Sequence, residues 1–410
     1  MKVLMIAPYV TLLGRSEFLR NQTGFGYMVM DIAKAVGKID EVDLLATDTQ
    51  GKSFTHERVC VLKRSVWGFI LLLHRCISPT MVVRLWRKYR MSKGALLRLV
   101  YYWLMTGYLT DILKKGGYDF VHIHGCSFAT ELWMQVCRQC GQKFVVTLHG
   151  LNSFSDTVKL EPAGKKYERD FLKRVTDGEI HITVISTGMK KLIEKTYNVP
   201  GCKNITVVCN SFNFEEEKNS SLDVRKQYGI SQNAKVLLYV GNISYNKNQA
   251  QMVRAFGLLP DDKQKKIYVL FCGADHAKDG GLQGLIGHSS YKDHLILCGT
   301  VDKNGMASYY RTADGVVLLS FAEGFGLSLV EGMHFGLPCV MHQNLDAFED
   351  IYDERAVVAA KGREDVDVAQ AIEILISREW SKDAIKNYSK KFESETMAQK
   401  YIEVFQKVLG

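Results

Sequence analysis

Short apolar runs alternate with segments of helical periodicity along almost the whole chain. In the first half, six runs are short, rich in β-branched residues and ended by a turn or a polar residue, as expected of buried strands. They are residues 3–7, 42–46, 120–123, 144–148, 182–185 and 205–208. A helical pattern opens at Gly24, and others separate the later runs. Strands that alternate with helices predict α/β architecture with a parallel sheet.

A polar and charged segment, residues 210–235, interrupts this alternation and is the best linker candidate. A second series of apolar runs follows it, at residues 236–240, 267–272, 295–297, 316–319 and 339–341. The last residues, from about 382, again have helical periodicity. We therefore predict two doubly wound, Rossmann-like domains, residues 1–214 and 215–381, followed by a C-terminal helical segment, 382–410.

The net charge of +9 is concentrated in one part of the chain. Residues 58–110 contain ten Lys or Arg and no Asp or Glu, and the rest of the chain has 43 basic against 44 acidic residues. The same segment holds three of the five tryptophans and apolar runs flanked by Arg or Lys. Amphipathic basic helices with Trp and Tyr are typical of anionic membrane surfaces, so we expect membrane contact here. The alternative is a set of ordinary helices whose basic side chains snorkel outward.

Other classes of protein are disfavoured. No nucleic-acid motif accompanies the basic segment, so we expect no nucleic-acid partner. The ten cysteines are sparse and lie mostly in apolar runs, which indicates a reducing compartment. Cys137 and Cys140 form a CxxC without a second pair, so we interpret them as helix-face cysteines rather than a zinc site. The first apolar run stops at Pro8, and no run reaches about 18 residues, so a cytoplasmic protein is expected.

The strongest candidate site follows the apolar run 316–319. Glu323 lies in the predicted turn, and Gly324 and Gly326 allow close approach of the backbone to a ligand. Amides near Gly326 and Leu327 would form a helix N-terminus suited to a diphosphate. Glu331, about one turn further, is at the reach expected for a ribose diol. The alternative is that Glu323 complements the helix dipole and Glu331 is a solvated helix residue.

This segment resembles a known family. The Glu-x7-Glu spacing, followed by His-Phe-Gly-Leu-Pro-Cys-Val at residues 334–340, is similar to the retaining nucleotide-sugar glycosyltransferases of the GT-B fold, group 1 and family 4. The resemblance implies two Rossmann-like domains facing across a cleft, with the donor held by the second domain, the acceptor by the first, and segment 382–410 packed back on the first. It implies that Glu323 contacts donor-sugar hydroxyls, that Glu331 contacts the ribose, and that the Gly324, Phe325, Gly326 and Leu327 backbone lies near the sugar and diphosphate.

Other segments carry the resemblance in the same order. Asn242 and Lys247 lie where the family has an Arg and a Lys that neutralise the diphosphate, so Asn242 halves the expected cationic charge. Val301 lies where backbone flanks the base. His149 matches a strand-end histidine that approaches the donor sugar and the acceptor, although a lone strand-end His is more often structural. Gly26 matches loosely the glycine loop near the acceptor and β-phosphate.

The expected mechanism follows from these residues. No Asp-x-Asp motif ends a strand, and Asp365-Val366-Asp367 precedes a helical pattern, where it is cap material, so the sequence requires no metal. We expect no cofactor, because the nucleotide sugar, of UDP or GDP type, is a substrate. Lys247 and the helix amides would then stabilise the leaving diphosphate. The family retains the anomeric configuration, with the leaving phosphate helping to deprotonate the acceptor.

The sequence thus predicts a retaining, metal-independent glycosyltransferase with His149 and Glu323 at its catalytic centre. The expected acceptor is a glycan or a polyprenyl-linked oligosaccharide, and the expected role is cell-surface polysaccharide synthesis. We expect the protein to bind this acceptor at the inner face of the plasma membrane. One alternative is a GT-B sugar-nucleotide isomerase, such as a 2-epimerase, which needs no acceptor. Another is a non-catalytic subunit that binds nucleotide sugar and membrane; Asn242 favours it, and the intact acid pair opposes it.

Overall fold

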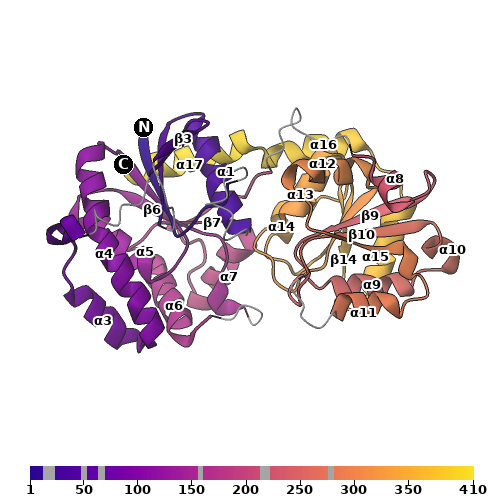
Figure 1. Ribbon diagram of the computed structural model, residues 1–410, viewed down its shortest axis with the longest axis horizontal. Coiled ribbons are helices and arrows are strands. Elements are labelled where there is room, and N and C mark those ends of the chain that lie inside the picture. Colours follow the sequence, from indigo (N-terminus) through magenta and orange to yellow (C-terminus); the bar gives the residue numbers. More distant parts are fainter. Residues whose placement is uncertain (13–23, 48–52, 63–69, 156–159, 213–221, 276–280) are drawn as a thin grey trace. The chain divides into compact units, whose positions relative to one another are not determined.

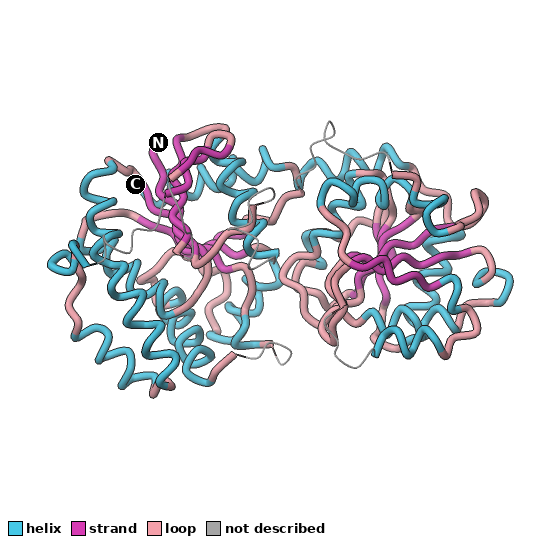
Figure 2. The backbone as a smooth tube through the Cα atoms, viewed as in Figure 1, coloured by secondary structure: helices cyan, strands magenta, loops and turns pink. Residues whose placement is uncertain are grey.

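The computed structural model describes residues 1–410 except 13–23, 48–52, 63–69, 156–159, 213–221 and 276–280 (Figure 1). The chain divides into two compact units, Met1–Asn210 together with Ser394–Gly410, and Ser211–Glu393. Each unit has its own central sheet with helices around it (Figure 2). The chain re-enters the first unit at Ser394, so of the C-terminal helices α16 (Lys382–Ser389) belongs to the second unit and α17 (Ser394–Leu409) to the first.

The first unit contains an eight-stranded sheet in the order β3-β4-β2-β1-β5-β6-β7-β8. The strands are β1 (Lys2–Ala7), β2 (Glu41–Ala46), β3 (Phe54–His56), β4 (Val59–Leu62), β5 (Phe120–His124), β6 (Phe144–Leu148), β7 (Ile182–Val184) and β8 (Ile205–Val207). All neighbours are parallel except β3 and β4, which form an antiparallel edge hairpin. The six strands predicted for this half are confirmed, and the hairpin was missed.

Helices cover both faces of this sheet. They are α1 (Gly24–Gly37), α3 (Thr80–Tyr89), α4 (Lys93–Gly116), α5 (Phe128–Gln139), α6 (Pro162–Thr176), α7 (Thr187–Tyr197) and α17, with 3₁₀ turns at Leu73–Arg75 and Asn152–Phe154. Helices α1 and α17 pack together on one face, and α4, α5 and α6 lie on the other (Figure 1). The C-terminal helix therefore completes a sheet whose strands lie far from it in the sequence.

The contact between α17 and the sheet is aromatic. Phe405 stacks on Phe120 of β5 with 4.8 Å between ring centroids, and the rings of Tyr401 and Phe405 lie 5.0 and 5.2 Å from that of His122. Tyr401 and Phe405 are fully buried. Burying such side chains contributes roughly 2 kcal/mol each, so α17 is part of the core of the first unit.

The second unit has a six-stranded, wholly parallel sheet in the order β11-β10-β9-β12-β13-β14. The strands are β9 (Lys235–Val240), β10 (Ile267–Cys272), β11 (Leu295–Gly299), β12 (Gly315–Leu318), β13 (Cys339–His342) and β14 (Val357–Ala360). The helices are α8 (Val224–Tyr228), α9 (Gln249–Gly257), α10 (Asp261–Gln264), α11 (Gly281–Gly287), α12 (Lys303–Thr312), α13 (Leu327–His334), α14 (Phe348–Ile351), α15 (Asp365–Ser377) and α16, with 3₁₀ turns at Lys292–His294 and Lys390–Phe392. Five strands were predicted correctly, and only β14 was missed.

The predicted linker, residues 210–235, is wrong in its second half. It contains α8, whose N-cap Asp223 accepts a hydrogen bond from the amide of Lys226 at 3.0 Å. Arg225 donates to the carbonyls of Ser231 and Ala234 at 2.7 and 3.0 Å. The polar composition therefore belongs to a capped surface helix, while the acidic centre of the segment, within 213–221, lies outside the described residues.

The capping role expected for residues 365–367 is confirmed at the start of α15. Glu364 is the N-cap, and Asp367 Oδ2 accepts a hydrogen bond from its amide at 3.1 Å. Asp365 instead forms an ion pair with Arg254 Nε at 2.7 Å. Both aspartates thus have structural partners.

Candidate functional site

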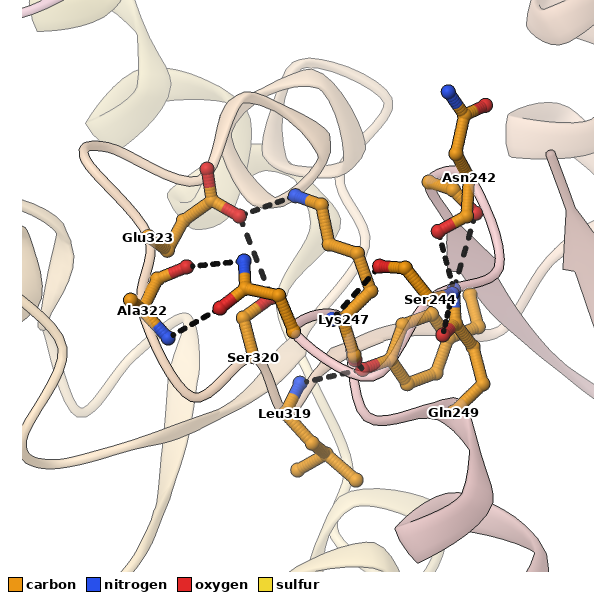
Figure 3. Close-up of polar contacts among 11 residues, drawn as sticks. Asn242, Ser244, Lys247, Gln249, Leu319, Ser320, Ala322 and Glu323 are labelled. Atoms are coloured by element: carbon orange, nitrogen blue, oxygen red, sulfur yellow. Dashed lines mark hydrogen bonds and ion pairs between the residues drawn. The ribbon is translucent and has the colours of Figure 1, made fainter. Parts of the chain in front are cut away.

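An ion pair joins the carboxyl ends of two neighbouring strands of the second unit (Figure 3). Lys247 lies in the segment after β9, and Glu323 lies in the segment after β12. The Nζ atom of Lys247 contacts the Oε2 atom of Glu323. Ser320 Oγ donates to the same carboxylate oxygen at 3.3 Å. The side chains are 27% and 19% exposed, so both charges are accessible without being fully solvated. In parallel α/β sheets this edge is where ligands bind.

Asn246 connects the two segments that carry this ion pair. Its side-chain amide donates to the carbonyl of Ala322 at 2.9 Å, and its side-chain oxygen accepts from the Ala322 amide at 3.2 Å (Figure 3). Its backbone carbonyl accepts from the amide of Phe321 at 2.8 Å. Three hydrogen bonds from one residue hold the backbone beside Glu323 in place, which is the kind of preorganisation that a binding site requires.

Tyr239, on β9, forms hydrogen bonds with the backbone of the same two segments. Its hydroxyl contacts the carbonyl of Lys247 and accepts a hydrogen bond from the amide of Leu319 at 2.9 Å. Burial raises the pKa of this phenol above its usual range, so it remains a neutral donor and acceptor. The backbone on either side of the ion pair is thus fixed by one buried hydroxyl.

Asn242 lies at the carboxyl end of β9 and is exposed. Its carbonyl accepts from Gln249 Nε2 at 3.2 Å (Figure 3). Its side-chain oxygen accepts from the amide of Ala274 at 3.3 Å. At the neighbouring strand end, a Cβ on Gly273 would lie 2.2 Å from the carbonyl oxygen of Gly241, so that position requires glycine. Asn242 therefore ties these loops together without adding charge, and Lys247 is the one cation of the predicted pair.

Helix α13 begins directly after the Glu323 turn. Gly326 is its N-cap, in the left-handed region at φ +93°, a conformation that favours glycine. The amides of Leu327 and Ser328 lie at the positive end of the helix dipole and precede the first hydrogen bond of the helix, in which the Leu329 amide donates to the carbonyl of Gly326 at 3.0 Å. Glu331 Oε2 accepts a hydrogen bond from Tyr310 Oη of α12 at 2.6 Å, so the second glutamate is positioned by a tyrosine.

The remaining predicted donor-side residues have different surroundings. Phe325 is 3% exposed and packs against Phe392 at 5.7 Å, so its side chain belongs to the core. Gly324 lies in the turn that precedes Phe325. Val301 is half-buried between β11 and α12, beside Asp302, the N-cap of α12. These residues could reach a ligand through their backbone.

Asp346, after β13, is a carboxylate near Glu323 that the sequence analysis missed. Burial and the neighbouring Glu323 charge raise the pKa of Asp346 above its usual value. Its strand adjoins β12 in the sheet, which brings the two carboxylates to the same edge. The signal available in the sequence was weak, because Asp346 lies in a turn that carries no recognisable motif.

In the first unit, His149 follows β6, and its Nε2 lies 3.1 Å from Nδ1 of His124, the last residue of β5. Burial lowers the pKa of His149 to about 4, so the imidazole is neutral at physiological pH. The rings of Phe25 and His149 form a T-shaped contact with 4.9 Å between their centroids. The sequence did not indicate His124, because it lies within an apolar strand.

Gly26 has a structural reason to be glycine. It lies in the first turn of α1, where an added Cβ would lie 2.2 Å from Thr11 Oγ1. Its carbonyl accepts from the amide of Thr11 at 3.1 Å. The glycine thus permits close packing of α1 against the segment that follows β1.

A pocket of about 500 Å³ lies at the carboxyl ends of β1 and β5 in the first unit, beside α4 and α6. Five aromatic residues contribute to its wall: Tyr9, Phe25, Tyr102, Phe128 and Tyr167. Polar side chains are supplied by Arg98, Asn152 and Glu161, and Arg98 Nη2 lies 3.5 Å from Glu161 Oε1. Its size and its mixture of aromatic and polar groups are typical of small-molecule sites.

The basic segment is only partly helical. Residues 59–62 form β4 rather than a helix because they pair with β2, and 63–69 lie outside the described residues. Helices α3 and α4 follow, and the segment exposes Ile70, Leu71, Leu73, Val83, Trp86, Leu97 and Val100. None of the helices in the described part of the chain has both the length and the apolar composition needed to cross a bilayer.

The cysteines are free thiols in the structure. Cys137 is buried on α5, where burial raises the pKa of its thiol, and Cys140 follows the helix. Within the described ranges, no group of three or more His, Cys, Asp or Glu side chains is arranged to hold a metal ion.

Two family models match the chain. Glycosyltransferase Family 4 matches residues 23–216, and Glycosyl transferases group 1 matches residues 220–392. The chain therefore belongs to the group-1 glycosyltransferases, and its two parallel-sheet units have the GT-B fold. The resemblance and the fold class predicted from the sequence are confirmed.

Individual relatives are distant. N-acetyl-alpha-D-glucosaminyl L-malate synthase of Bacillus anthracis is 25% identical over 240 residues, 57% of this chain and 58% of that protein. O-antigen chain mannosyltransferase B of Escherichia coli is 23% identical over 241 residues, 58% of this chain and 63% of that protein. The chain thus matches about three fifths of these relatives' length. The solved structure of sucrose-phosphate synthase from Thermosynechococcus elongatus has a similar fold, with a TM-score of 0.73 and 17% sequence identity. The match covers 100% of this chain and 99% of that one.

Proposed function

We propose that this protein transfers a sugar from a nucleotide sugar of UDP or GDP type to a glycan or polyprenyl-linked acceptor, with retention and without a metal or other cofactor. The observation that carries the proposal is the Lys247–Glu323 ion pair at the strand ends, beside the N-terminus of α13. Membership of the group-1 family supports the reaction class. A role in cell-surface polysaccharide synthesis is part of the proposal.

The proposed reaction breaks the bond between the anomeric carbon and the diphosphate oxygen and forms a bond from that carbon to the acceptor oxygen. The acceptor proton passes to the leaving diphosphate, so the reaction is balanced without an external base. The Lys247 ammonium has three donors, and it can therefore contact Glu323 and a phosphate oxygen together. The first-turn amides of α13 add positive potential where negative charge develops. Glu323 would accept hydrogen bonds from sugar hydroxyls.

We place the acceptor in the 500 Å³ pocket of the first unit. Sugar rings pack through their C–H faces on aromatic side chains, which this wall provides. Arg98 supplies a guanidinium that suits a phosphate group next to the sugar. Because α4 contributes both to this pocket and to the exposed apolar surface, an acceptor could reach the pocket from that surface.

We also propose that α3 and α4 rest on the anionic inner face of the plasma membrane. Trp86 is 41% exposed and Leu97 72%, with arginines and lysines beside them in the sequence. Such a surface gains from both apolar burial and attraction to anionic lipid. The test is co-sedimentation with anionic vesicles. Replacing Arg84, Arg87, Lys88 and Arg90 with Gln should abolish it, and unchanged binding would contradict the proposal.

The function is tested by incubating the purified protein with a panel of nucleotide sugars and acceptor glycans. Release of nucleoside diphosphate that depends on the acceptor supports transfer, and the anomeric configuration of the product tests retention. Interconversion of nucleotide sugars without an acceptor would instead identify an epimerase. Binding of a nucleotide sugar without turnover under every condition would identify a non-catalytic subunit.

A further inference from the structure

A chain of polar side chains crosses one face of the first sheet, from β7 to His149. Thr183 of β7 lies 2.5 Å from Thr147 of β6, and Thr147 Oγ1 lies 2.6 Å from His122 Nε2 of β5. Two residues further along β5, His124 Nδ1 lies 3.1 Å from His149 Nε2. The two β5 histidines point to the same face because side chains alternate along a strand. The polar chain therefore ends at a residue predicted to touch substrate.

Helix α17 seals this face. Its Tyr401 and Phe405 pack on the His122 ring, and the rings of His122 and His124 lie 4.1 Å apart. Both histidines are 0% exposed. Burial lowers the pKa of His122 to about 3 and that of His124 well below its usual value, so both rings are neutral. A neutral imidazole has one N–H and one nitrogen that only accepts.

The surroundings of His124 decide which nitrogen carries the proton. Its Nε2 is buried and has no hydrogen-bond partner among the described residues. A buried donor without an acceptor is rare in proteins, whereas an acceptor without a donor is tolerated more often. The proton of His124 therefore belongs on Nδ1, which donates to His149 Nε2 across the 3.1 Å contact.

We infer that His124 is a positioning residue that keeps His149 in the tautomer protonated at Nδ1, so that His149 donates a hydrogen bond to substrate and does not act as a base. With its Nε2 accepting from His124 and its Nδ1 protonated, His149 has no free lone pair for a substrate proton. This inference rests on the proposed function for its substrate. It assigns His149 to orienting a sugar or phosphate oxygen and leaves proton removal to the leaving diphosphate.

The tautomer can be measured without activity. In protein with ¹⁵N-labelled histidine, two-bond ¹H–¹⁵N correlation spectra at neutral pH show which ring nitrogen of each neutral histidine is protonated. We expect His149 to be protonated at Nδ1, and to change to the Nε2 form, which imidazoles prefer in water, in the His124→Leu variant. His181→Leu is a matched control, because His181 contacts Thr206 at 3.0 Å on the same sheet without touching His149. A wild-type His149 protonated at Nε2 would overturn the inference.

Kinetics separate positioning from structural support. His124→Leu should lower kcat about tenfold with donor KM changed less than twofold. His124→Asn, whose side-chain amide can donate from the position of Nδ1, should restore most of kcat and the Nδ1 tautomer. Equal losses in both variants, with His149 still protonated at Nδ1, would overturn the positioning role. If the tautomer is as inferred but no nucleotide sugar is turned over, the proposed function fails and the tautomer assignment stands.

Discussion

Lys247 and Glu323 are 76 positions apart in the sequence, yet they form an ion pair at the carboxyl edge of one parallel sheet. The pairing follows from topology, because β9 and β12 are neighbours in the sheet although two other strands separate them along the chain. Asn246 and Tyr239 then hold the two segments together. The ion pair thus has the local support expected of a binding site.

Adding a cation at Asn242 should strengthen donor binding. The residue is exposed, and Arg there would place a second positive charge near the proposed diphosphate position. We expect Asn242→Arg to lower the donor KM about fivefold, equivalent to ~1 kcal/mol, with a smaller effect at high salt. Asn242→Gln, which also disturbs the contact with Ala274 but adds no charge, is the control. Equal KM values for the two variants would show that the diphosphate binds elsewhere.

Removing the Tyr310 hydroxyl should weaken the proposed ribose contact. Tyr310 Oη donates to Glu331 at 2.6 Å and fixes the carboxylate. We expect Tyr310→Phe to raise the donor KM about fivefold while kcat stays within about twofold, because ribose contacts are equal in the ground and transition states. Steady-state kinetics with varied donor concentration measure both constants. A fall in kcat at constant KM would contradict the ribose assignment of Glu331.

Gly26→Ala should destabilise the first unit. The new Cβ would lie 2.2 Å from Thr11 Oγ1, so α1 or the segment after β1 must move. Such overpacking costs about 2 kcal/mol. Gly24→Ala, two residues earlier on the same helix, meets no atom within 4 Å and should change stability by less than about 0.5 kcal/mol. Urea unfolding compares the two variants, and equal stability would refute the packing explanation.

The buried histidines should make stability depend on pH. Burial lowers the pKa of His122 to about 3 and of His149 to about 4, against 6.5 for an exposed histidine. Below pH 6.5 the unfolded chain therefore binds protons that the folded chain excludes, and stability is lost as pH falls towards 4. Within this window, each of the two histidines lowers the free energy of unfolding by about 1 kcal/mol for each unit by which the pH falls. The free energy of unfolding of His122→Asn should fall less between pH 6.5 and 5 than that of the wild type; an equal fall would contradict this explanation.

Much of the fold was predictable from the sequence because its strands are buried on both faces. Runs such as residues 267–272 and 144–148 match β10 and β6 in both bounds. The edge hairpin β3–β4 and the edge strand β14 were missed because they are short, and β14 is half alanine. Edge strands bury fewer large side chains, so their periodicity is weaker.

Candidate site residues could be predicted from motifs in the sequence, but the contacts between them could not. Glu323, Glu331 and Lys247 are predicted from motifs in separate segments, whereas the ion pair between Lys247 and Glu323 and the contact of Tyr310 with Glu331 depend on the folded sheet. His124 was hidden in an apolar strand, and its role emerges from its neighbour His149. Gly26 matched a ligand loop in pattern, whereas its contact with Thr11 explains the glycine by packing.

The most direct test of the central claim is turnover of the Lys247→Met variant. In the proposed donor site this ammonium faces the leaving diphosphate, so kcat/KM should fall at least about 100-fold with the fold intact. Lys235→Met is a matched control, because Lys235 forms an ion pair with Asp314 at 2.9 Å at the other end of the same strand. The account predicts near wild-type nucleoside diphosphate release for Lys235→Met and almost none for Lys247→Met. Wild-type turnover by Lys247→Met would contradict it.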